Sequence, residues 1–217
     1  MIENLLRLKA LYTHQFLGSR YVDEFKHIKT QSQDSLPKDM ASLKKQTIQC
    51  KLCDLAKTRK NVVFGEGNKS AKVMLIGEGP GASEDESGRP FVGRAGMLLE
   101  KIINNVLKLQ RDEVFIANIV KCRPPQNRQP SEEEAKSCLP FLLKQIEIVS
   151  PTIIVALGST SYKYLTNDTM PISKIRGEII NYANRKLIAT FHPCYLLRNP
   201  SAKKEAFEDF LKVKSFI

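Results

Sequence analysis

Four short apolar runs, separated by segments with helical periodicity, constrain the fold of this chain most strongly. The runs cover residues 73–76, 114–120, 153–157 and 187–191, and each has the length of a buried strand. Between them, residues 96–109 show helical spacing, and Ser131 with Glu134 forms a capping box for a helix that reaches about Val149. Apolar strands that alternate with helices are typical of a parallel sheet covered on both faces. The sequence therefore predicts an α/β fold whose ligand-binding loops follow residues 76, 120 and 191.

The first 48 residues differ in character from the rest of the chain. Residues 2–17 place apolar side chains on one helical face, whereas residues 27–48 are polar and predict a linker. The length of 217 residues suits one domain with an appendage. We therefore expect an N-terminal helical extension and linker over residues 1–45, and a single domain over residues 46–217.

Charge and hydropathy narrow the environment in which the chain works. No apolar run is long enough to span a bilayer, and Arg7 and Lys9 interrupt the N-terminal apolar residues, so we expect a cytoplasmic protein without a membrane segment. The formal net charge is +11. Residues 1–48 carry 8 Lys and Arg against 5 Asp and Glu, so most of the positive charge belongs to the later residues. Nucleic acid is the expected partner of such a surface, although many basic proteins bind none.

The five cysteines suggest a metal centre. Without a secretory signal they argue against a disulfide framework. Cys50 and Cys53 form a C-x-x-C pair, Cys122 ends a predicted strand, and Cys138 lies in a predicted helix, so four thiols from three segments can converge. Such a set suits tetrahedral zinc as well as a [4Fe-4S] cluster, and spacing does not decide between them. Cys138 can also be read as a small buried hydrophobic residue.

Polar and aromatic residues follow the predicted strands. The glycine-rich loop at residues 77–81 matches neither the P-loop nor the dinucleotide-binding signature. Phe91 precedes a helix, Asn118 lies at the end of a strand, and His192 follows the last strand. Taken singly, each residue has an ordinary structural explanation. Phe91 can pack in the core, Asn118 can form a turn, and His192 can be a loop residue whose side chain is satisfied by hydrogen bonds. Together they indicate one site at the carboxyl edge of the sheet.

These segments resemble family 4 of the uracil-DNA glycosylase superfamily, its iron-sulfur branch. The resemblance runs from Cys50 to about Pro200 and includes, in order, the C-x-x-C pair, GEGPG, GRPFVGRAG, NIVKCRPPQNR and HPCYLLRNP. It implies a three-layer α/β/α sandwich around a four-stranded parallel sheet. It also implies a [4Fe-4S] cluster on Cys50, Cys53, Cys122 and Cys138, with zinc in second place.

The resemblance further implies base-excision repair chemistry, in which uracil is flipped out of double- or single-stranded DNA and its N-glycosidic bond is hydrolysed. Phe91 would stack on uracil, Asn118 would pair with its O4 and N3–H, and His192 would donate a hydrogen bond to O2 as negative charge develops. The implied uracil-binding set is Glu78, Gly79, Phe91, Asn118 and His192. The implied DNA-binding set is Arg94, Lys121, Leu196 and Arg198, with Leu196 and Leu197 as candidate wedges.

The chain departs from the better-known branch of the superfamily at Gly79, where that branch carries a water-activating aspartate. Glu78 and Glu84 are therefore the alternative catalytic carboxylates, and we expect Asn127 to support Glu84 by a hydrogen bond. Cys194 is expected to be a free thiol. No lysine is placed as a Schiff-base nucleophile, so we expect a monofunctional hydrolase that leaves the strand uncut. We also expect a monomer. A non-catalytic module that binds uracil-containing DNA and a redox-responsive regulator are the competing hypotheses.

Overall fold

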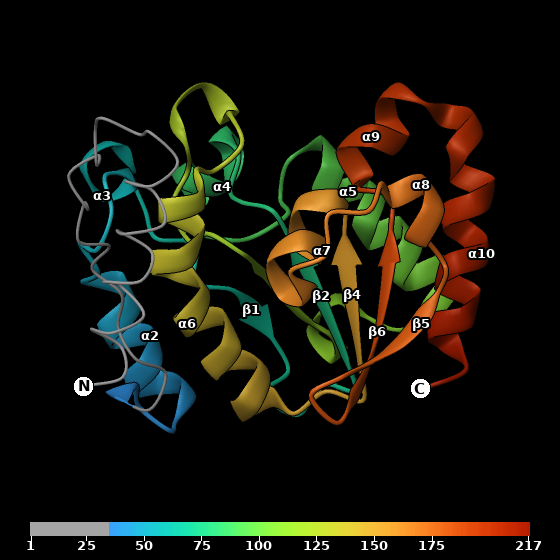
Figure 1. Cartoon of the computed structure of the whole chain (residues 1–217), viewed down its shortest axis with the longest axis horizontal. Helices are drawn as coiled ribbons and strands as arrows, with labels where there is room; N and C mark the ends of the chain where they lie inside the picture. The colour runs from blue at the N-terminus through green and yellow to red at the C-terminus, as the bar shows by residue number, and fades with distance from the viewer. Residues whose placement is uncertain (1–34) are drawn as a thin grey trace, which may run out of the picture.

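The computed structural model describes residues 35–217, and the helix expected over residues 2–17 lies outside them. The described chain forms a central sheet between two layers of helices (Figure 1). This arrangement confirms the predicted three-layer α/β/α sandwich. No helix within residues 35–217 is long and apolar enough to cross a membrane.

The sheet has six strands in the order β1-β3-β2-β4-β6-β5. Its four inner strands are parallel and are those that the sequence predicts: β2 (Val73–Gly77), β3 (Phe115–Asn118), β4 (Ile153–Leu157) and β6 (Arg185–Thr190). The sheet is wider than predicted, because antiparallel strands β1 (Glu66–Gly67) and β5 (Ile179–Tyr182) extend its edges. Strand β1 has two residues and β5 has no buried side chain, so neither contains a buried apolar run.

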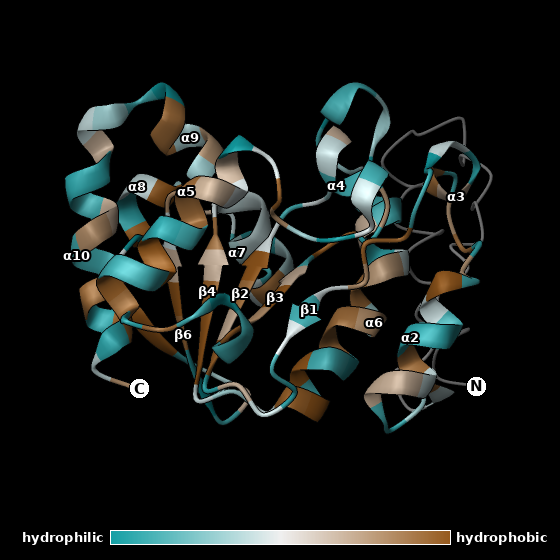
Figure 2. Cartoon of the chain, turned by 180° about the vertical axis from the view of Figure 1, so that it is seen from behind, coloured by the Kyte–Doolittle hydropathy of each residue, from teal (hydrophilic) through white to brown (hydrophobic). Residues whose placement is uncertain are grey.

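Helices cover both faces of the sheet. Helices α2 (Met40–Ile48), α6 (Glu132–Val149) and α7 (Ser159–Thr166) contribute to the core on one face. Helices α5 (Arg94–Ile102) and α10 (Lys203–Lys214) contribute to the core on the other face. Shorter α-helices within residues 35–217 are α3 (Leu55–Thr58), α4 (Ala82–Ser87), α8 (Ile172–Ile175) and α9 (Pro193–Arg198). Hydrophobic strands therefore lie between amphipathic helices, as Figure 2 shows.

Two helix predictions are confirmed with changed bounds or detail. The N–H of Glu134 donates to Oγ of Ser131 (3.2 Å), and the N–H of Ser131 donates to Oε2 of Glu134 (2.7 Å), so the predicted capping box starts α6. The helix predicted over residues 96–109 begins at Arg94 and changes at Ile103 into a π-helical segment that ends at Leu107.

The linker predicted over residues 27–48 is wrong for its last nine residues, which form α2. The Asp39 side chain caps this helix by accepting a hydrogen bond from the N–H of Ser42 (2.9 Å). Only Met40, Leu43 and Thr47 are buried, and Leu43 belongs to the same core cluster as α6. A helix that buries so narrow a stripe leaves little apolar signal in its sequence.

The strand ends bring the predicted site loops together. In the register of the sheet, Gly77 at the end of β2 lies opposite Asn118 at the end of β3. In the same way, Leu157 at the end of β4 lies opposite Thr190 at the end of β6. The loops that carry Glu78, Asn118 and His192 therefore leave the sheet at one edge.

Candidate active site and cysteine cavity

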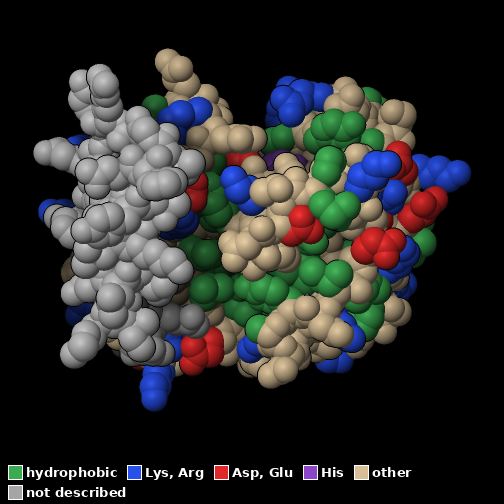
Figure 3. Space-filling view, viewed as in Figure 1, with side chains coloured by type: hydrophobic (Ala, Val, Ile, Leu, Met, Phe, Trp, Pro, Cys, Tyr) green, Lys and Arg blue, Asp and Glu red, His purple; other side chains and the backbone are tan. Residues whose placement is uncertain are grey.

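Loops at the carboxyl edge of the sheet line a cavity of about 540 Å³. Figure 3 shows this region as a hollow at the upper edge of the molecule, with a histidine deep in it and Lys and Arg side chains on both rims. Its lining includes all six predicted catalytic and uracil-binding residues: Glu78, Gly79, Glu84, Phe91, Asn118 and His192. The prediction that these residues share one site agrees with this arrangement.

Asn118 lines the cavity and carries an unsatisfied polar atom. The residue is 2% exposed, and its Oδ1 is buried without a hydrogen-bond partner in residues 35–217. Buried polar atoms are rarely left in this state, because the missing partner costs about 1–3 kcal/mol. A Cβ placed on Gly77 would lie 2.4 Å from this Oδ1 and 2.5 Å from the ring of Phe91. Glycine at position 77 therefore leaves room for both side chains.

Phe91 forms an aromatic wall beside Asn118. Its ring centroid lies 5.8 Å from that of His192, with the two ring planes tilted by 35°. Its backbone has a φ of 50°, in the left-handed region that side-chain-bearing residues rarely adopt. The ring is buried and lines the cavity, so it contributes to the core and offers a stacking surface at once.

His192 has a fixed tautomer at the start of α9. Its Nδ1 accepts a hydrogen bond from the N–H of Cys194 (3.1 Å), so the proton of the neutral ring belongs on Nε2. Burial, together with the positive charge of Arg198, lowers the pKa of His192 to about 4. The imidazole is therefore neutral at pH 7 and has one N–H left to donate.

The two candidate carboxylates have different surroundings. Oε1 of Glu84 accepts from the N–H groups of Val92 (3.0 Å) and Gly93 (2.9 Å), and its Oε2 accepts from the N–H of Gly81 (3.1 Å). The Glu78 side chain has no hydrogen bond or ion pair to the described residues, although it lines the same cavity. Glu84 thus holds backbone in place, whereas the Glu78 carboxylate is available to a ligand.

The expected support of Glu84 by Asn127 is wrong. Oδ1 of Asn127 accepts from Nε of Arg123 (2.8 Å), while Glu84 is bonded to three backbone N–H groups. A carboxylate with that many donors has little need of a side-chain amide.

Four of the five cysteines, Cys50, Cys53, Cys122 and Cys138, line a second cavity, between α3, α6 and the end of β3. Cys194 lies apart from them, exposed beside the first cavity, and all five are free of disulfides. Burial raises the pKa of the Cys122 thiol to about 11 and that of Cys138 to about 12, and the neighbouring cysteines add to both shifts. Without a cation these groups are neutral thiols.

Hydrogen-bond donors surround the cysteine sulfurs. Arg59 donates to Sγ of Cys122 (3.1 Å) and to the carbonyl oxygen of Cys50 (2.7 Å), and the N–H of Lys121 donates to Sγ of Cys138 (3.3 Å). Such donors stabilise thiolate ligands. Within residues 35–217, however, no three Cys, His, Asp or Glu side chains are arranged to hold a metal ion.

Comparison with known proteins places the chain in a family. A model described as the uracil DNA glycosylase superfamily matches residues 64–213. The chain belongs to this superfamily. The type-4 uracil-DNA glycosylase of Thermotoga maritima is 49% identical over 172 residues, which cover 77% of this chain and 89% of that protein. The type-4 enzyme of Sulfurisphaera tokodaii is 46% identical over 189 residues, which cover 83% of this chain and 84% of that protein. The resemblance to family 4 is confirmed.

The prediction of DNA contact is wrong for two residues of the glycosylase, Lys121 and Leu196. Lys121 is 1% exposed, because its Nζ turns inward and donates to the carbonyl oxygen of Asn118 (2.9 Å) and to Oε1 of Gln145 (2.6 Å). Leu196 is also 1% exposed and packs in a cluster with Phe191 and Ala206. Neither side chain can reach DNA at the surface.

The other surface candidates of the glycosylase are exposed. Arg94 at the start of α5 and Arg198 at the end of α9 are both exposed, and Arg198 lines the cavity. Leu197 is 36% exposed beside the cavity-lining Tyr195, so the wedge prediction is retained for Leu197 and withdrawn for Leu196. The two leucines are adjacent in sequence, and only the direction in which each side chain leaves the helix makes one buried and the other exposed.

Several supporting residues of the glycosylase site were missed from sequence. Arg111 donates to the carbonyl oxygen of Phe91 (3.2 Å), and Gln145 links Lys121 to the carbonyl oxygen of Phe64 (2.9 Å from its Nε2). Arg111 lies 20 residues from Phe91, and Gln145 lies in the middle of α6. No local pattern in the sequence marks a residue that acts through backbone oxygens. The role of Gly77 as a glycine that leaves room for the site was easier to recognise, because it lies directly before Glu78 in the glycine-rich loop.

Proposed function

We propose that the protein is a monofunctional uracil-DNA glycosylase that flips uracil from DNA and hydrolyses its N-glycosidic bond, leaving an abasic site for base excision repair. One observation carries the proposal: Asn118, whose buried Oδ1 has no hydrogen-bond partner in residues 35–217, lines the same cavity as Phe91 and His192. The type-4 uracil-DNA glycosylases to which the chain is similar support the same conclusion.

The Asn118 amide accounts for selection of uracil. Its unpartnered Oδ1 accepts the N3–H of uracil, and its Nδ2 donates to O4. Cytosine presents an acceptor at N3 and a donor at C4, so both hydrogen bonds would be lost, and an unpaired buried amide would remain. Phe91 stacks on the extruded ring, an interaction that is worth about 1–3 kcal/mol for a base on an aromatic side chain.

Bond cleavage uses the neutral His192. As the bond between C1′ and N1 breaks, the electron pair moves to the uracil ring and is shared with O2, which accepts a hydrogen bond from Nε2–H. The Glu78 carboxylate, without another partner among the described residues, orients water and stabilises the positive charge on the sugar. The water oxygen forms a bond to C1′, and the proton that it loses is taken up, through solvent, by the uracil anion, so the products are neutral free uracil and an abasic site.

DNA is held at the rim and opened by an apolar wedge. Arg94 and Arg198 are exposed cations that suit phosphate contacts, and the exposed Leu197 would fill the stack after the base leaves. We propose that the protein binds DNA as a monomer.

We further propose that Cys50, Cys53, Cys122 and Cys138 hold a [4Fe-4S] cluster. Their shared cavity and surrounding donors fit such a group. Four thiols in one cavity suit zinc as well as a cluster. The resemblance to family 4, the iron-sulfur branch, and the similarity to type-4 enzymes favour the cluster. When bound, it would cross-link three segments of the chain.

The decisive experiment measures release of free uracil from oligonucleotides that contain uracil, with thymine and cytosine oligonucleotides as controls. Wild type, Asn118→Ala and His192→Ala are compared, with Asn104→Ala as a matched control, because Asn104 also has a buried, unpartnered Oδ1 but lies outside the cavity. We expect uracil-specific release without strand cleavage, lost in the first two variants and kept in the third. Tight binding of uracil-containing DNA by wild type without release would instead establish a binding module.

A further inference from the structure

The backbone of residues 90 and 91 is held by a side chain from a distant part of the chain. Arg111 donates from one guanidinium nitrogen to the carbonyl oxygen of Phe91 (3.2 Å) and from another to that of Pro90. Because Phe91 has a φ of 50°, its backbone occupies a conformation that must be imposed by its surroundings. The guanidinium fork is a rigid means of imposing it.

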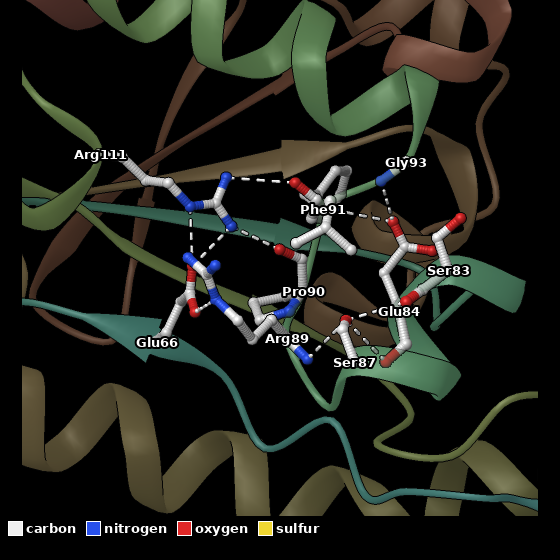
Figure 4. Close-up of polar contacts among 10 residues, drawn as sticks. Glu66, Ser83, Glu84, Ser87, Arg89, Pro90, Phe91, Gly93 and Arg111 are labelled. Atoms are coloured by element: carbon white, nitrogen blue, oxygen red, sulfur yellow. Dashed lines mark hydrogen bonds and ion pairs between the residues drawn. The ribbon is translucent and has the colours of Figure 1, made fainter.

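The same segment is fixed from its other side. Oε1 of Glu84 accepts from the N–H groups of Val92 and Gly93 (3.0 and 2.9 Å), directly after Phe91. Helix α5 also packs closely against the carbonyl group of Phe91, because a Cβ on Gly96 would lie 1.9 Å from this oxygen. Figure 4 shows Arg111 and Glu84 on opposite sides of the segment. The aromatic wall of the cavity is thus clamped between a cation and an anion.

Arg111 is itself oriented by the edge strand that the sequence did not reveal. Its Nε donates to Oε1 of Glu66 in β1 (2.7 Å), and both side chains are largely shielded, at 16% and 25% exposed. Glu66 stands between Gly65 and Gly67, whose φ angles are 126° and 124°. A Cβ on Gly67 would lie 1.9 Å from the backbone oxygen of Val114, so glycine is needed for β1 to pack against the chain next to β3. The two-residue strand therefore serves to place Glu66.

We propose that Arg111 is a positioning residue for uracil recognition, oriented by Glu66, which sets the stacking face of Phe91 through the backbone oxygens of residues 90 and 91. The proposal rests on the proposed function, because it takes uracil as the ring that stacks on Phe91. Arg111 itself does not line the cavity, so its effect must pass through Phe91.

The test compares two arginines that share one carboxylate. Arg111→Met removes the clamp, whereas Arg89→Met removes a cation whose side-chain hydrogen bonds within the described residues go to Glu66 alone. We expect Arg111→Met to weaken inhibition by free uracil about tenfold and to slow single-turnover base release about tenfold, as for loss of one good hydrogen bond. The KM for DNA should change less than about twofold, since phosphate contacts remain. Arg89→Met should stay within about twofold of wild type in every measurement.

A double-mutant cycle with Phe91→Leu separates positioning from a general loss of structure. If Arg111 acts through the aromatic ring, Arg111→Met should change uracil inhibition less than about twofold in the Phe91→Leu background. Additive losses, or an unchanged inhibition constant in the single variant, would overturn the proposal. Arg111→Lys serves if the methionine variant does not fold, because one ammonium cannot bridge two carbonyl groups and Glu66, and it should show the same loss in inhibition. Should wild type release no uracil, the proposed function fails, while binding of free uracil still tests the clamp.

Discussion

At the scale of single residues, substitutions of Glu78 and Glu84 should affect different properties. The first should slow catalysis, and the second should lower stability. The Glu84 carboxylate accepts three backbone hydrogen bonds, whereas the Glu78 carboxylate has no hydrogen bond or ion pair to the described residues. We expect Glu78→Gln to slow base release about a hundredfold, the size typical of a lost acid–base group, with an unchanged Tm. Glu84→Gln should lower the free energy of unfolding by about 1–3 kcal/mol, because it removes a charged acceptor. Single-turnover kinetics and calorimetry on both variants check this, and the reverse pattern would assign the water to Glu84.

His192 makes a second prediction at this scale. An imidazole with the ordinary pKa of 6.5 would be mostly protonated at pH 5, but burial and Arg198 lower the pKa of His192 to about 4. Protonation of Nδ1 would also break its hydrogen bond from the N–H of Cys194. The active neutral form is therefore present above the lowered pKa and is lost only as pH falls through it. We expect the single-turnover rate to fall less than about threefold between pH 7 and pH 5; a drop centred near pH 6.5 would contradict this.

Residue types were predictable wherever chemistry demands one side chain. Phe91, Asn118 and His192 were predicted from their places beside the predicted strands and from the resemblance to family 4, and all three line one cavity. Lys121 and Leu196 were misassigned, because a sequence motif records which residues are required but not whether they face solvent. Lys121 is required inside, where its Nζ holds the backbone oxygen of Asn118. The charged residue next to Cys122 was interpreted as a surface cation, and its burial reverses that interpretation.

At the scale of elements, helix α9 offers two adjacent leucines in opposite environments. Leu196 is buried with Phe191, while Leu197 is exposed at the rim of the cavity. We expect Leu196→Ala to lower the free energy of unfolding by about 2–5 kcal/mol, as is usual for a truncated core leucine. Leu197→Ala should leave Tm unchanged and slow base release from duplex DNA more than from single strands, because only the duplex must be opened. Equal effects of Leu197→Ala on both substrates would remove the wedge assignment.

Elements with buried apolar runs were predictable, and those without them were not. The four inner strands and the capping box of α6 were predicted because burial on both faces and end-capping leave local signals. Strands β1 and β5 and helix α2 left none, since β1 has two residues and α2 buries a narrow stripe. Yet β1 places Glu66 beside Arg111. Short edge elements can thus carry function that hydropathy does not reveal.

At the scale of the whole molecule, the cysteine cavity joins segments that are far apart in sequence. Cys50 and Cys53 lie between α2 and α3, Cys122 follows β3, and Cys138 belongs to α6. A cluster on these thiolates would tie residues 40–58 to the sheet and its covering helix. Without it, the buried thiols are protonated, because burial raises their pKa values, and the tie is lost.

We therefore expect Cys138→Ser, and likewise removal of the cluster by chelation after oxidation, to abolish the iron content and the visible absorbance and to lower Tm. Amide hydrogen exchange should rise first in residues 40–58, whose other anchors are the narrow buried stripe of α2 and the buried Leu55 of α3. Cys194→Ser is the matched control, because this exposed thiol lies outside the cysteine cavity and should keep both iron and Tm. Zinc in place of iron in the wild-type protein would reject the cluster. An unchanged exchange pattern in iron-free Cys138→Ser would show that residues 40–58 are held by packing alone.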